Sequence, residues 1–237
     1  PFGLRSPKTK EVVKTVDARA LWQKIIEIRL QTGEPYLIFS DTVNRAMPQH
    51  QRELGLSVRQ SNLCSEIMLH TGKDHQGLER TAVCCLSSVN AETFLEWRDH
   101  PTFIEDVMRF LDNVLEDFIV RAPPEMRNAV YAARRERSVG LGLMGFHSFL
   151  QSQNVPFESA MAKSWNMRLF KTLRRQCDAA SRKLAAERGP CPDAAERGIM
   201  ERFSHKLAIA PTASISIICG GTSAGIEPIP ANIYTHK

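Results

Sequence analysis

The sequence has no long hydrophobic run, no targeting segment and no paired cysteine motif, and each absence excludes a class of protein. No apolar stretch approaches the roughly 20 residues that a transmembrane helix needs, so we expect a soluble, cytoplasmic protein with no membrane partner. The six cysteines show no C-x-x-C spacing, which argues against structural zinc. Without a secretory signal, their thiols are expected to be reduced.

Aromatic residues are also scarce, at 7% of the chain, while the formal net charge is +5. Much of the basic excess falls between residues 121 and 188, notably at Arg134-Arg135 and Arg174-Arg175. We interpret these side chains as the solvated outer faces of amphipathic helices. Because no DNA-reading or RNA-reading motif accompanies them, a nucleic acid polymer is not an expected partner, whereas phosphorylated small molecules are compatible with the charge.

The 237 residues, of which 43% are hydrophobic, read as one helix-rich α/β domain. The opening residues predict a loop and then a helix, with Asp17 as N-cap and Gly33 at its end. Helical spacing of apolar residues and proline or glycine stops predict further helices, and short apolar runs predict strands. The predicted helices are 101–120, 125–136 and 160–187, and the predicted strands are 35–40, 81–90 and 206–210.

Glycines at positions 140, 142 and 145 punctuate the run SVGLGLMGFHSFLQSQ. We expect them at the start of a helix that packs closely against a neighbouring backbone. The same spacing occurs in dinucleotide-binding turns, but those follow a strand, whereas charged residues precede this run. We therefore expect no dinucleotide site here.

The stretch Asn62-Leu63-Cys64-Ser65-Glu66 places one thiol between an amide and a carboxylate. In a strand or extended loop, Asn62, Cys64 and Glu66 would project to the same side. The acid could then accept a proton, the amide could hydrogen-bond a hydroxyl, and the thiol could act as a nucleophile or hydrogen-atom carrier. A nearby acid disfavours a thiolate, which argues against a thiol protease. A plain buried turn is the alternative interpretation.

Small residues and hydroxyls also gather in the run APTASIS, residues 210–216. The backbone N–H groups of such a turn can approach an oxyanion, and the hydroxyls of Thr212, Ser214 and Ser216 can donate hydrogen bonds to it. The run is typical of a phosphate-binding turn. A Ser/Thr-rich connection between two strands would have the same composition.

Three motifs in this order, NLCSEI at 62–67, TAVCCLSSVN at 81–90 and APTASISIICGGTSAGIEPI at 210–229, resemble the catalytic large subunit of class I ribonucleotide reductase. The resemblance covers essentially the whole chain. It implies a helix-rich part of a ten-stranded α/β barrel with a central finger loop. Residues 1–237 would be a partial catalytic barrel domain from the middle of a longer chain, with the N-terminal regulatory and C-terminal segments absent.

The resemblance implies reduction of ribonucleotides to 2′-deoxyribonucleotides by thiyl-radical chemistry. Cys64 would remove the ribose 3′-hydrogen, Glu66 would accept the 3′-hydroxyl proton, and Asn62 would hold the ribose hydroxyls. Cys84 would be one of two redox thiols, with its partner in the absent N-terminal part. Neighbouring residues on a strand face opposite ways, so only one of Cys84 and Cys85 can point into the barrel, and Cys85 remains the alternative.

By the same resemblance, the turn would bind the substrate's phosphates through Pro211, Thr212, Ala213, Ser214 and Ile215. Whether the substrate is a diphosphate or a triphosphate stays open at this point.

The resemblance also implies which partners the chain needs. No cofactor or metal is expected within it, because the radical would come from a di-metal small subunit and the electrons from thioredoxin or glutaredoxin. The remaining segments of the large subunit and a ribonucleotide substrate complete the list, and the chain alone is expected to be inactive. Two alternatives remain: a segment of a cobalamin-dependent (class II) reductase, and a non-catalytic scaffold or interaction fragment.

Overall fold

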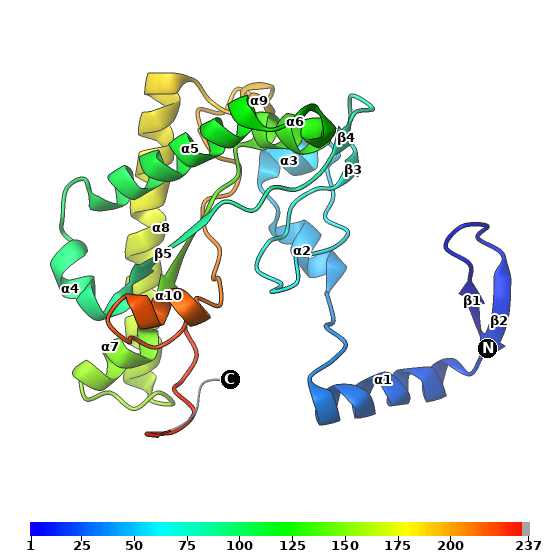
Figure 1. The fold of residues 1–237 in the computed structure, drawn as a ribbon, viewed down its shortest axis with the longest axis horizontal. Coiled ribbons are helices and arrows are strands. Elements are labelled where there is room, and N and C mark those ends of the chain that lie inside the picture. The colour runs from blue at the N-terminus through cyan, green and yellow to red at the C-terminus, as the bar shows by residue number, and fades with distance from the viewer. Residues whose placement is uncertain (234–237) are drawn as a thin grey trace. The chain divides into compact units, whose positions relative to one another are not determined.

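A computed structural model describes residues 1–233 of the chain. The chain divides into two compact units, Pro1–Phe39 and a larger one that starts at Ser40. The helices and strands of both units are drawn in Figure 1.

The first unit consists of an antiparallel hairpin and one helix. Strand β1 (Phe2–Arg5) pairs with β2 (Val12–Val16), in residues for which the sequence predicted a loop. Helix α1 (Ala18–Thr32) begins and ends as predicted. The Asp17 side chain accepts a hydrogen bond from the Ala20 N–H at 2.7 Å, and Gly33 closes the helix with a φ of 80°, a left-handed conformation that favours glycine.

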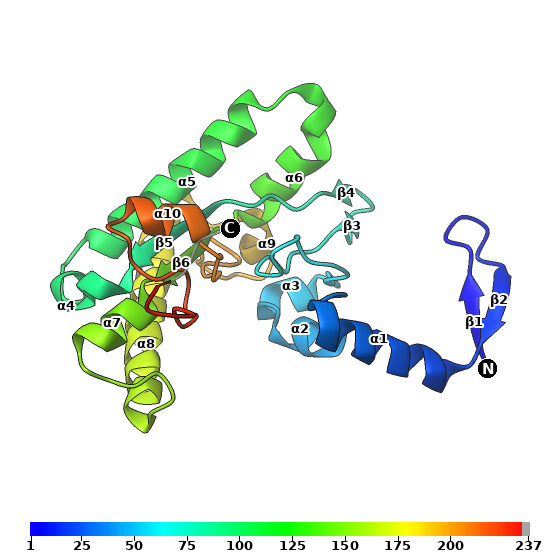
Figure 2. The same cartoon turned by 60° about the horizontal axis from the view of Figure 1, so that its bottom comes forward.

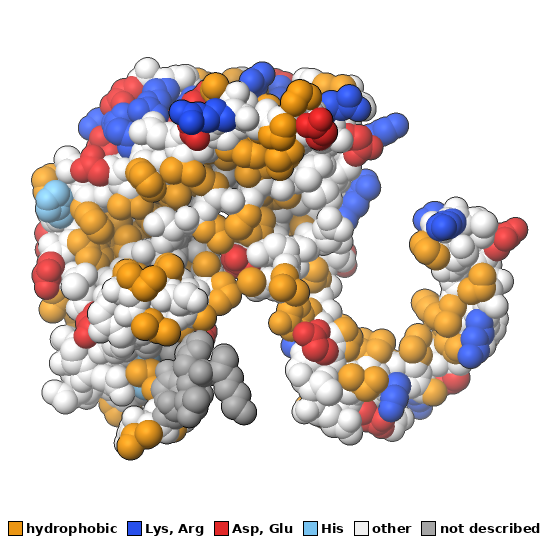
Figure 3. Space-filling model, viewed as in Figure 1, with side chains coloured by type: hydrophobic (Ala, Val, Ile, Leu, Met, Phe, Trp, Pro, Cys, Tyr) orange, Lys and Arg blue, Asp and Glu red, His pale blue; other side chains and the backbone are white. Residues whose placement is uncertain are grey.

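This first unit has no buried side chains in either strand or in α1. Several of its large apolar residues, among them Trp22, Leu30 and Phe39, are exposed, and apolar side chains are visible along its surface in Figure 3. The predicted strand at 35–40 is wrong: these residues form no ladder, and Ser40 begins α2 (Ser40–Ala46). A short apolar run becomes a strand only where another strand pairs with it.

The core of the second unit lies around two long helices, α5 (Phe103–Arg121) and α8 (Ala160–Arg188). Fully buried residues of both helices, such as Met108 and Leu173, share one apolar cluster with strand and loop residues. Both helices confirm the sequence predictions, and Cys177 is a core thiol with no exposed surface. Helix α6 (Arg127–Glu136) follows a single 3₁₀ turn, Pro124–Met126.

A parallel strand pair crosses this core. Strand β5 (Leu86–Asn90) pairs in parallel with β6 (Gly140–Met144), and Leu141 of β6 also forms a parallel bridge to Leu207. Parallel neighbours need crossover connections, which α5 and α6 provide first and α7 (Phe146–Ser152) and α8 provide second. Figure 2 shows β5 and β6 side by side among these helices. The arrangement is that of a partial α/β barrel, and the strand predicted at 81–90 is confirmed for its second half.

The glycines of the 140–145 run lie in β6 and not, as predicted, at the start of a helix, which begins only at Phe146. Their expected close packing is confirmed. A β-carbon at Gly140 would collide with Leu86, and one at Gly142 would collide with the backbone carbonyl of Ala208. These contacts explain why glycine occupies the two positions of β6 at which the neighbouring segments approach most closely.

The remaining elements are short. They are α3 (Gln49–Glu53), β3 (Gly72–Lys73), β4 (Glu79–Arg80), the 3₁₀ turn Ala91–Thr93, α4 (Phe94–Trp97), α9 (Pro192–Ala195) and α10 (Ala213–Ile218). The strand predicted at 206–210 is reduced to the bridge at Leu207. Helix α10 includes the second half of the APTASIS run, where a turn and then a second strand were considered. Within residues 1–233, no helix is both long and apolar enough to cross a membrane.

Candidate active site

The cysteine stretch is a tight turn and not the extended segment that side-chain alternation assumes. The Ser65 N–H donates to the Asn62 carbonyl at 3.1 Å, and Ser65 has a φ of 65°. This left-handed residue bends the chain so that the Asn62 amide donates to a Glu66 carboxylate oxygen at 2.6 Å. The Ile67 N–H also donates to the Asn62 side chain. The predicted association of amide and acid is therefore present, by a different route, and Cys64 lies exposed between them.

The second thiol of the predicted site lies close to this turn. Cys84 and Asn62 line the same cavity, which has a volume of about 210 Å³. Partial burial raises the pKa of the Cys84 thiol, and the charges of Glu66 and Cys64 raise it further. The structure thus brings together the four residues for which the sequence predicted catalysis.

Cys84 and Cys85 face different surroundings. Cys84 is exposed, whereas Cys85 is buried and its thiol lies 3.7 Å from the Leu111 carbonyl. Burial raises the pKa of Cys85 to about 11, with a contribution from the Cys84 charge. Of the two thiols, only Cys84 is accessible from the cavity beside Asn62.

The APTASIS turn is closed by its own hydrogen bonds. Thr212 is buried with a φ of 55°, and its hydroxyl oxygen accepts from the Gly225 N–H at 2.7 Å. The Ser216 hydroxyl donates to the Ala213 carbonyl at 3.1 Å. The Thr212 hydroxyl keeps its own proton to donate, and Ser214 is exposed.

The turn and the cysteine group line separate cavities. Ala213 and Ser216 line one of about 270 Å³, whereas Asn62 and Cys84 line the cavity described above. Another cavity, of about 240 Å³, is lined by Glu66 and by Leu207 and Ala208, which lead into the turn. The described residues therefore do not join the two predicted groups in one pocket.

Sequence reasoning missed two buried charge clusters. Asp112 of α5 contacts Arg137, Arg188 and Arg202 at 2.7, 2.7 and 3.0 Å. Although burial raises the pKa of Asp112, hydrogen bonds from Arg202 and the charge of Arg137 outweigh it, so the net pKa is lowered. Arg137 lies in the basic run interpreted as an outer helix face, and that interpretation is wrong for it. It follows α6 in a left-handed conformation, which turns its side chain inward.

The second cluster is centred on Arg80, which contacts Asp74 at 2.9 Å and Asp193 at 2.6 Å. Asp193 also pairs with Arg135 at 2.7 Å, so Arg135 is not a solvated side chain either. A paired Arg cannot be told from a solvated one by composition, because its partners are far away in the sequence. These clusters connect β4 and α6 to α9, and α5 to α8.

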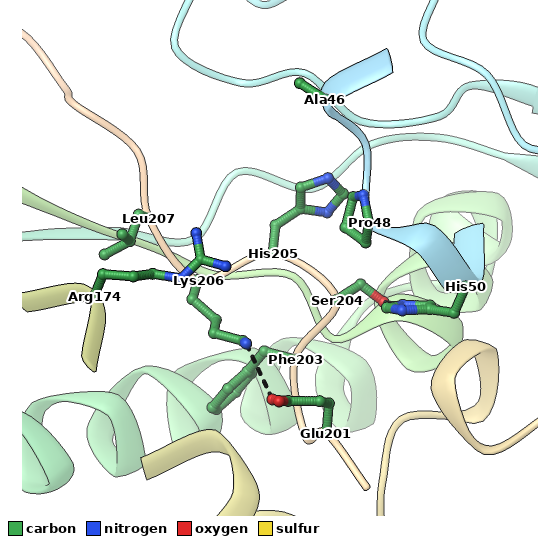
Figure 4. A pocket seen from close by; sticks show the side chains of 10 residues that line it. All are labelled: Ala46, Pro48, His50, Arg174, Glu201, Phe203, Ser204, His205, Lys206 and Leu207. Atoms are coloured by element: carbon green, nitrogen blue, oxygen red, sulfur yellow. Dashed lines mark hydrogen bonds and ion pairs between the residues drawn. The ribbon is translucent and has the colours of Figure 1, made fainter. Parts of the chain in front are cut away.

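A further polar cavity, of about 260 Å³, was not predicted at all. Figure 4 shows His50 against Ser204, joined at 2.9 Å, and Lys206 paired with Glu201. Burial, together with the charges of His50 and Lys206, lowers the pKa of His205 to about 4, so this imidazole is neutral near neutral pH. Isolated histidines, such as His50 in α3 and His205 in a loop, give no spacing signal from which such a cavity could be predicted.

The fold and the site together define a class of protein: a segment of an α/β barrel with an accessible thiol beside a hydrogen-bonded amide and carboxylate. A family model described as "Ribonucleotide reductase, barrel domain" matches residues 5–200 and 193–237. The chain therefore belongs to the ribonucleotide reductase family and corresponds to its barrel domain.

Individual relatives agree with this assignment. The chain is 48% identical, over 98% of its length and 36% of the relative's, to the ribonucleoside-diphosphate reductase large subunit of Invertebrate iridescent virus 3. It is 32% identical, over 98% of its length and 32% of the relative's, to a vitamin B12-dependent ribonucleoside-diphosphate reductase of Mycobacterium tuberculosis.

A solved structure, the class Id ribonucleotide reductase alpha subunit of Actinobacillus ureae, superimposes with a TM-score of 0.83 at 37% identity. The match covers 90% of this chain and 40% of that one. The chain thus spans about a third of the length of the curated relatives named above.

Proposed function

We propose that this chain supplies the thiol-bearing part of the active site of a ribonucleoside-diphosphate reductase, which converts ribonucleotides to 2′-deoxyribonucleotides. The observation that carries the proposal is the 2.6 Å hydrogen bond between Asn62 and Glu66 on either side of the exposed Cys64. An amide, an acid and a thiol within five residues can act on adjacent positions of one sugar. The named relatives are ribonucleoside-diphosphate reductases, which favours a diphosphate substrate.

In the proposed reaction, a thiyl radical on Cys64 abstracts the ribose 3′-hydrogen. Glu66 accepts the 3′-hydroxyl proton, and its bond to Asn62 fixes the orientation of the carboxylate toward the sugar. The Asn62 amide carries a second N–H with which to hold a ribose hydroxyl. The sugar radical then loses the 2′-hydroxyl as water, with a proton from a redox thiol. The dithiol pair supplies the two electrons and the protons that reduce the sugar as it closes to a disulfide, and Cys64 returns the hydrogen atom to C3′, which regenerates the thiyl radical.

We assign one of the two electron-donating thiols to Cys84. It is accessible and close enough to Glu66 and Cys64 for their charges to raise its pKa, whereas Cys85 is directed into the core. A raised pKa keeps Cys84 a thiol until it transfers hydrogen. The second thiol of the disulfide, and thioredoxin or glutaredoxin as reductant, would come from outside this chain.

The substrate phosphates are proposed to bind at the turn formed by Pro211, Thr212, Ala213, Ser214 and Ile215. The Thr212 hydroxyl accepts a hydrogen bond from the Gly225 N–H, and α10 begins directly after Thr212. The first backbone N–H groups of a helix have no partner within the helix and are proposed to donate to the phosphates.

The radical source is proposed to be a di-metal small subunit, as in class I enzymes. The residues described here include no group of three or more His, Cys, Asp or Glu side chains that could hold a metal. A cobalamin-dependent enzyme is the second candidate, because the 32% identity to such a reductase covers 98% of the chain. Turnover that requires adenosylcobalamin and no small subunit would favour the second candidate.

The proposal is tested with Cys64→Ser in the reductase assembled from this chain, the missing large-subunit segments and the small subunit. We expect deoxyribonucleotide formation to fall by at least about a thousandfold, because a hydroxyl cannot replace the thiyl radical. Cys219→Ser, which alters another exposed thiol, is the matched control and is expected to retain activity. Unchanged turnover in Cys64→Ser would exclude the radical role and favour a scaffold.

A further inference from the structure

The outer face of α8 carries an open groove of about 620 Å³ that belongs neither to the cysteine turn nor to the Thr212 turn. Met167 and Phe170 form an apolar floor, and Lys171, Arg174 and Arg175 surround it. Met167 is 48% exposed, and the opposite side of Phe170 packs against the core. This surface therefore combines a rigid apolar floor with positively charged edges.

The charge of this face is strongly one-sided. Between Lys163 and Arg182 the helix has six Lys or Arg residues and a single carboxylate, Asp178. Asp178 is already paired with Arg174 at 2.9 Å and with Lys206 at 2.7 Å. Burial acts to raise the pKa of Asp178, but these two hydrogen bonds lower it, so the carboxylate stays ionised and bound to them. It therefore leaves the charges of Lys171 and Arg175 available to a partner.

We propose that this groove docks an acidic peptide segment with an apolar anchor residue. Exposed cations without carboxylate partners attract acidic side chains, and the charge complementarity fixes the sign of the partner. The apolar floor favours a peptide over a nucleic acid as the partner. A phosphate backbone gains nothing from contact with Met167 and Phe170, whereas a Phe or Leu side chain buries apolar surface there. Met167 can also adapt its unbranched side chain to the anchor.

The test measures binding of a fluorescent peptide of about ten residues, rich in Asp and Glu with one central Phe, to the full chain by anisotropy. We expect the double variant Lys171→Glu, Arg175→Glu to weaken binding by at least about tenfold, and Met167→Ala by about threefold. Arg127→Glu, a charge reversal on the exposed start of α6, is the matched control and should leave the affinity unchanged.

Three further comparisons make the proposal falsifiable. A peptide with Ala in place of Phe should bind at least about threefold more weakly, and binding should weaken as salt rises. Equal binding of the Ala peptide would overturn the anchored mode. Full competition by oligo(dT) or by vesicles of anionic phospholipid, at equal charge, would assign the face to nucleic acid or membrane instead. No measurable binding of the Phe peptide, or unchanged binding to the double variant, would also refute the proposal.

Discussion

At the scale of single residues, the Asn62–Glu66 bond and the raised pKa of Cys84 describe one electrostatic unit. Burial is the main reason that the Cys84 pKa is raised, and the Glu66 charge is the next. The negative charge of Glu66 opposes the negative charge of a Cys84 thiolate. A change at Glu66 should therefore alter the reactivity of the Cys84 thiol, which can be measured without catalytic turnover.

We predict that Glu66→Gln lowers the pKa of Cys84, because it removes the negative charge that opposes thiolate formation. At about pH 8.5, alkylation of Cys84 by iodoacetamide should accelerate about twofold. Peptide mass spectrometry separates Cys84 from the other thiols. Glu79→Gln, an exposed neutralisation in β4, should leave the rate unchanged. A slower or unaltered reaction in Glu66→Gln would show that the two groups do not interact.

Glu136 gives a second prediction at this scale. Burial raises its pKa to about 7, against opposing contributions from the Gln51 hydrogen bond and the Arg80 charge. Because the folded state holds this proton to higher pH than the unfolded state, Glu136 makes the free energy of unfolding fall between about pH 4.5 and pH 7. The effect reaches its full size above pH 7.

Glu136→Gln should remove this pH dependence while keeping a hydrogen-bonding partner for Gln51. Relative to the unmodified chain, the variant should gain about 2 to 3 kcal/mol of stability as the pH rises from about 5 to 8. Urea unfolding of both chains at several pH values measures the difference in their free energies of unfolding. His205 has the opposite pH dependence, but it is present in both chains, so its contribution cancels in the difference. A constant difference across this range would mean that Glu136 has an ordinary pKa.

The site residues also show what sequence can and cannot predict at this scale. Asn62, Cys64 and Glu66 were selected by their chemical types and order, and Cys84 by the resemblance of its motif; the structure places them near one another, and their catalytic roles stay predictions. The turn at Ser65 was not predicted, since a left-handed serine gives no compositional signal. Likewise, the inward turn of Arg137 depends on one residue's backbone conformation and on Asp112, which is 25 residues away in the chain.

At the scale of elements, β6 determines how close its neighbours approach. Gly142 faces the backbone carbonyl of Ala208, which cannot move without breaking the hydrogen bonds of Leu141 to Lys206 and Ala208. Gly140 faces side-chain atoms of Leu86 and Ala208 instead. The Leu86 side chain can rotate away from an added methyl group, whereas the Ala208 carbonyl and the Ala208 β-carbon move only with their backbone.

We predict that Gly142→Ala destabilises the chain by about 2 to 3 kcal/mol, and that Gly140→Ala costs less. The Cβ in the first variant must displace the Ala208 carbonyl, while in the second it requires a rotamer change at Leu86 and a smaller shift of the Ala208 methyl group. Thermal or urea unfolding of the two variants gives the ranking. The interpretation is wrong if the two substitutions cost the same, or if Gly140→Ala costs more.

The elements that could be predicted from sequence are those whose own residue pattern identifies them without a partner segment. The helices α5 and α8 have apolar stripes that identify them without any partner, and both were predicted within about two residues. The apolar runs at 35–40 and 206–210 resemble strands, but their state depends on whether another segment pairs with them. The β1–β2 hairpin was missed because Gly3 and the polar turn that follows gave it the composition of a loop.

At the scale of the whole molecule, the two units differ in how much of their apolar surface is covered. The second unit has a continuous core that includes residues of α5, α7 and α8. The first unit is 39 residues of hairpin and helix without a buried side chain in either. A unit this small rarely holds a fold without a core, and a 15-residue helix is marginal in water by itself.

We therefore predict that backbone amides of α1 exchange with deuterium at close to unprotected rates in the isolated chain, while those of α5 and α8 are protected by several orders of magnitude. The second unit acts as the internal control within the same sample. Adding the large-subunit segments that relatives have and this chain lacks should slow exchange in α1, because Trp22 and Leu30 would gain an apolar surface to pack against. Mass spectrometry of peptic fragments follows both helices. Protection of α1 equal to that of α5 in the isolated chain would mean that the first unit is stable by itself.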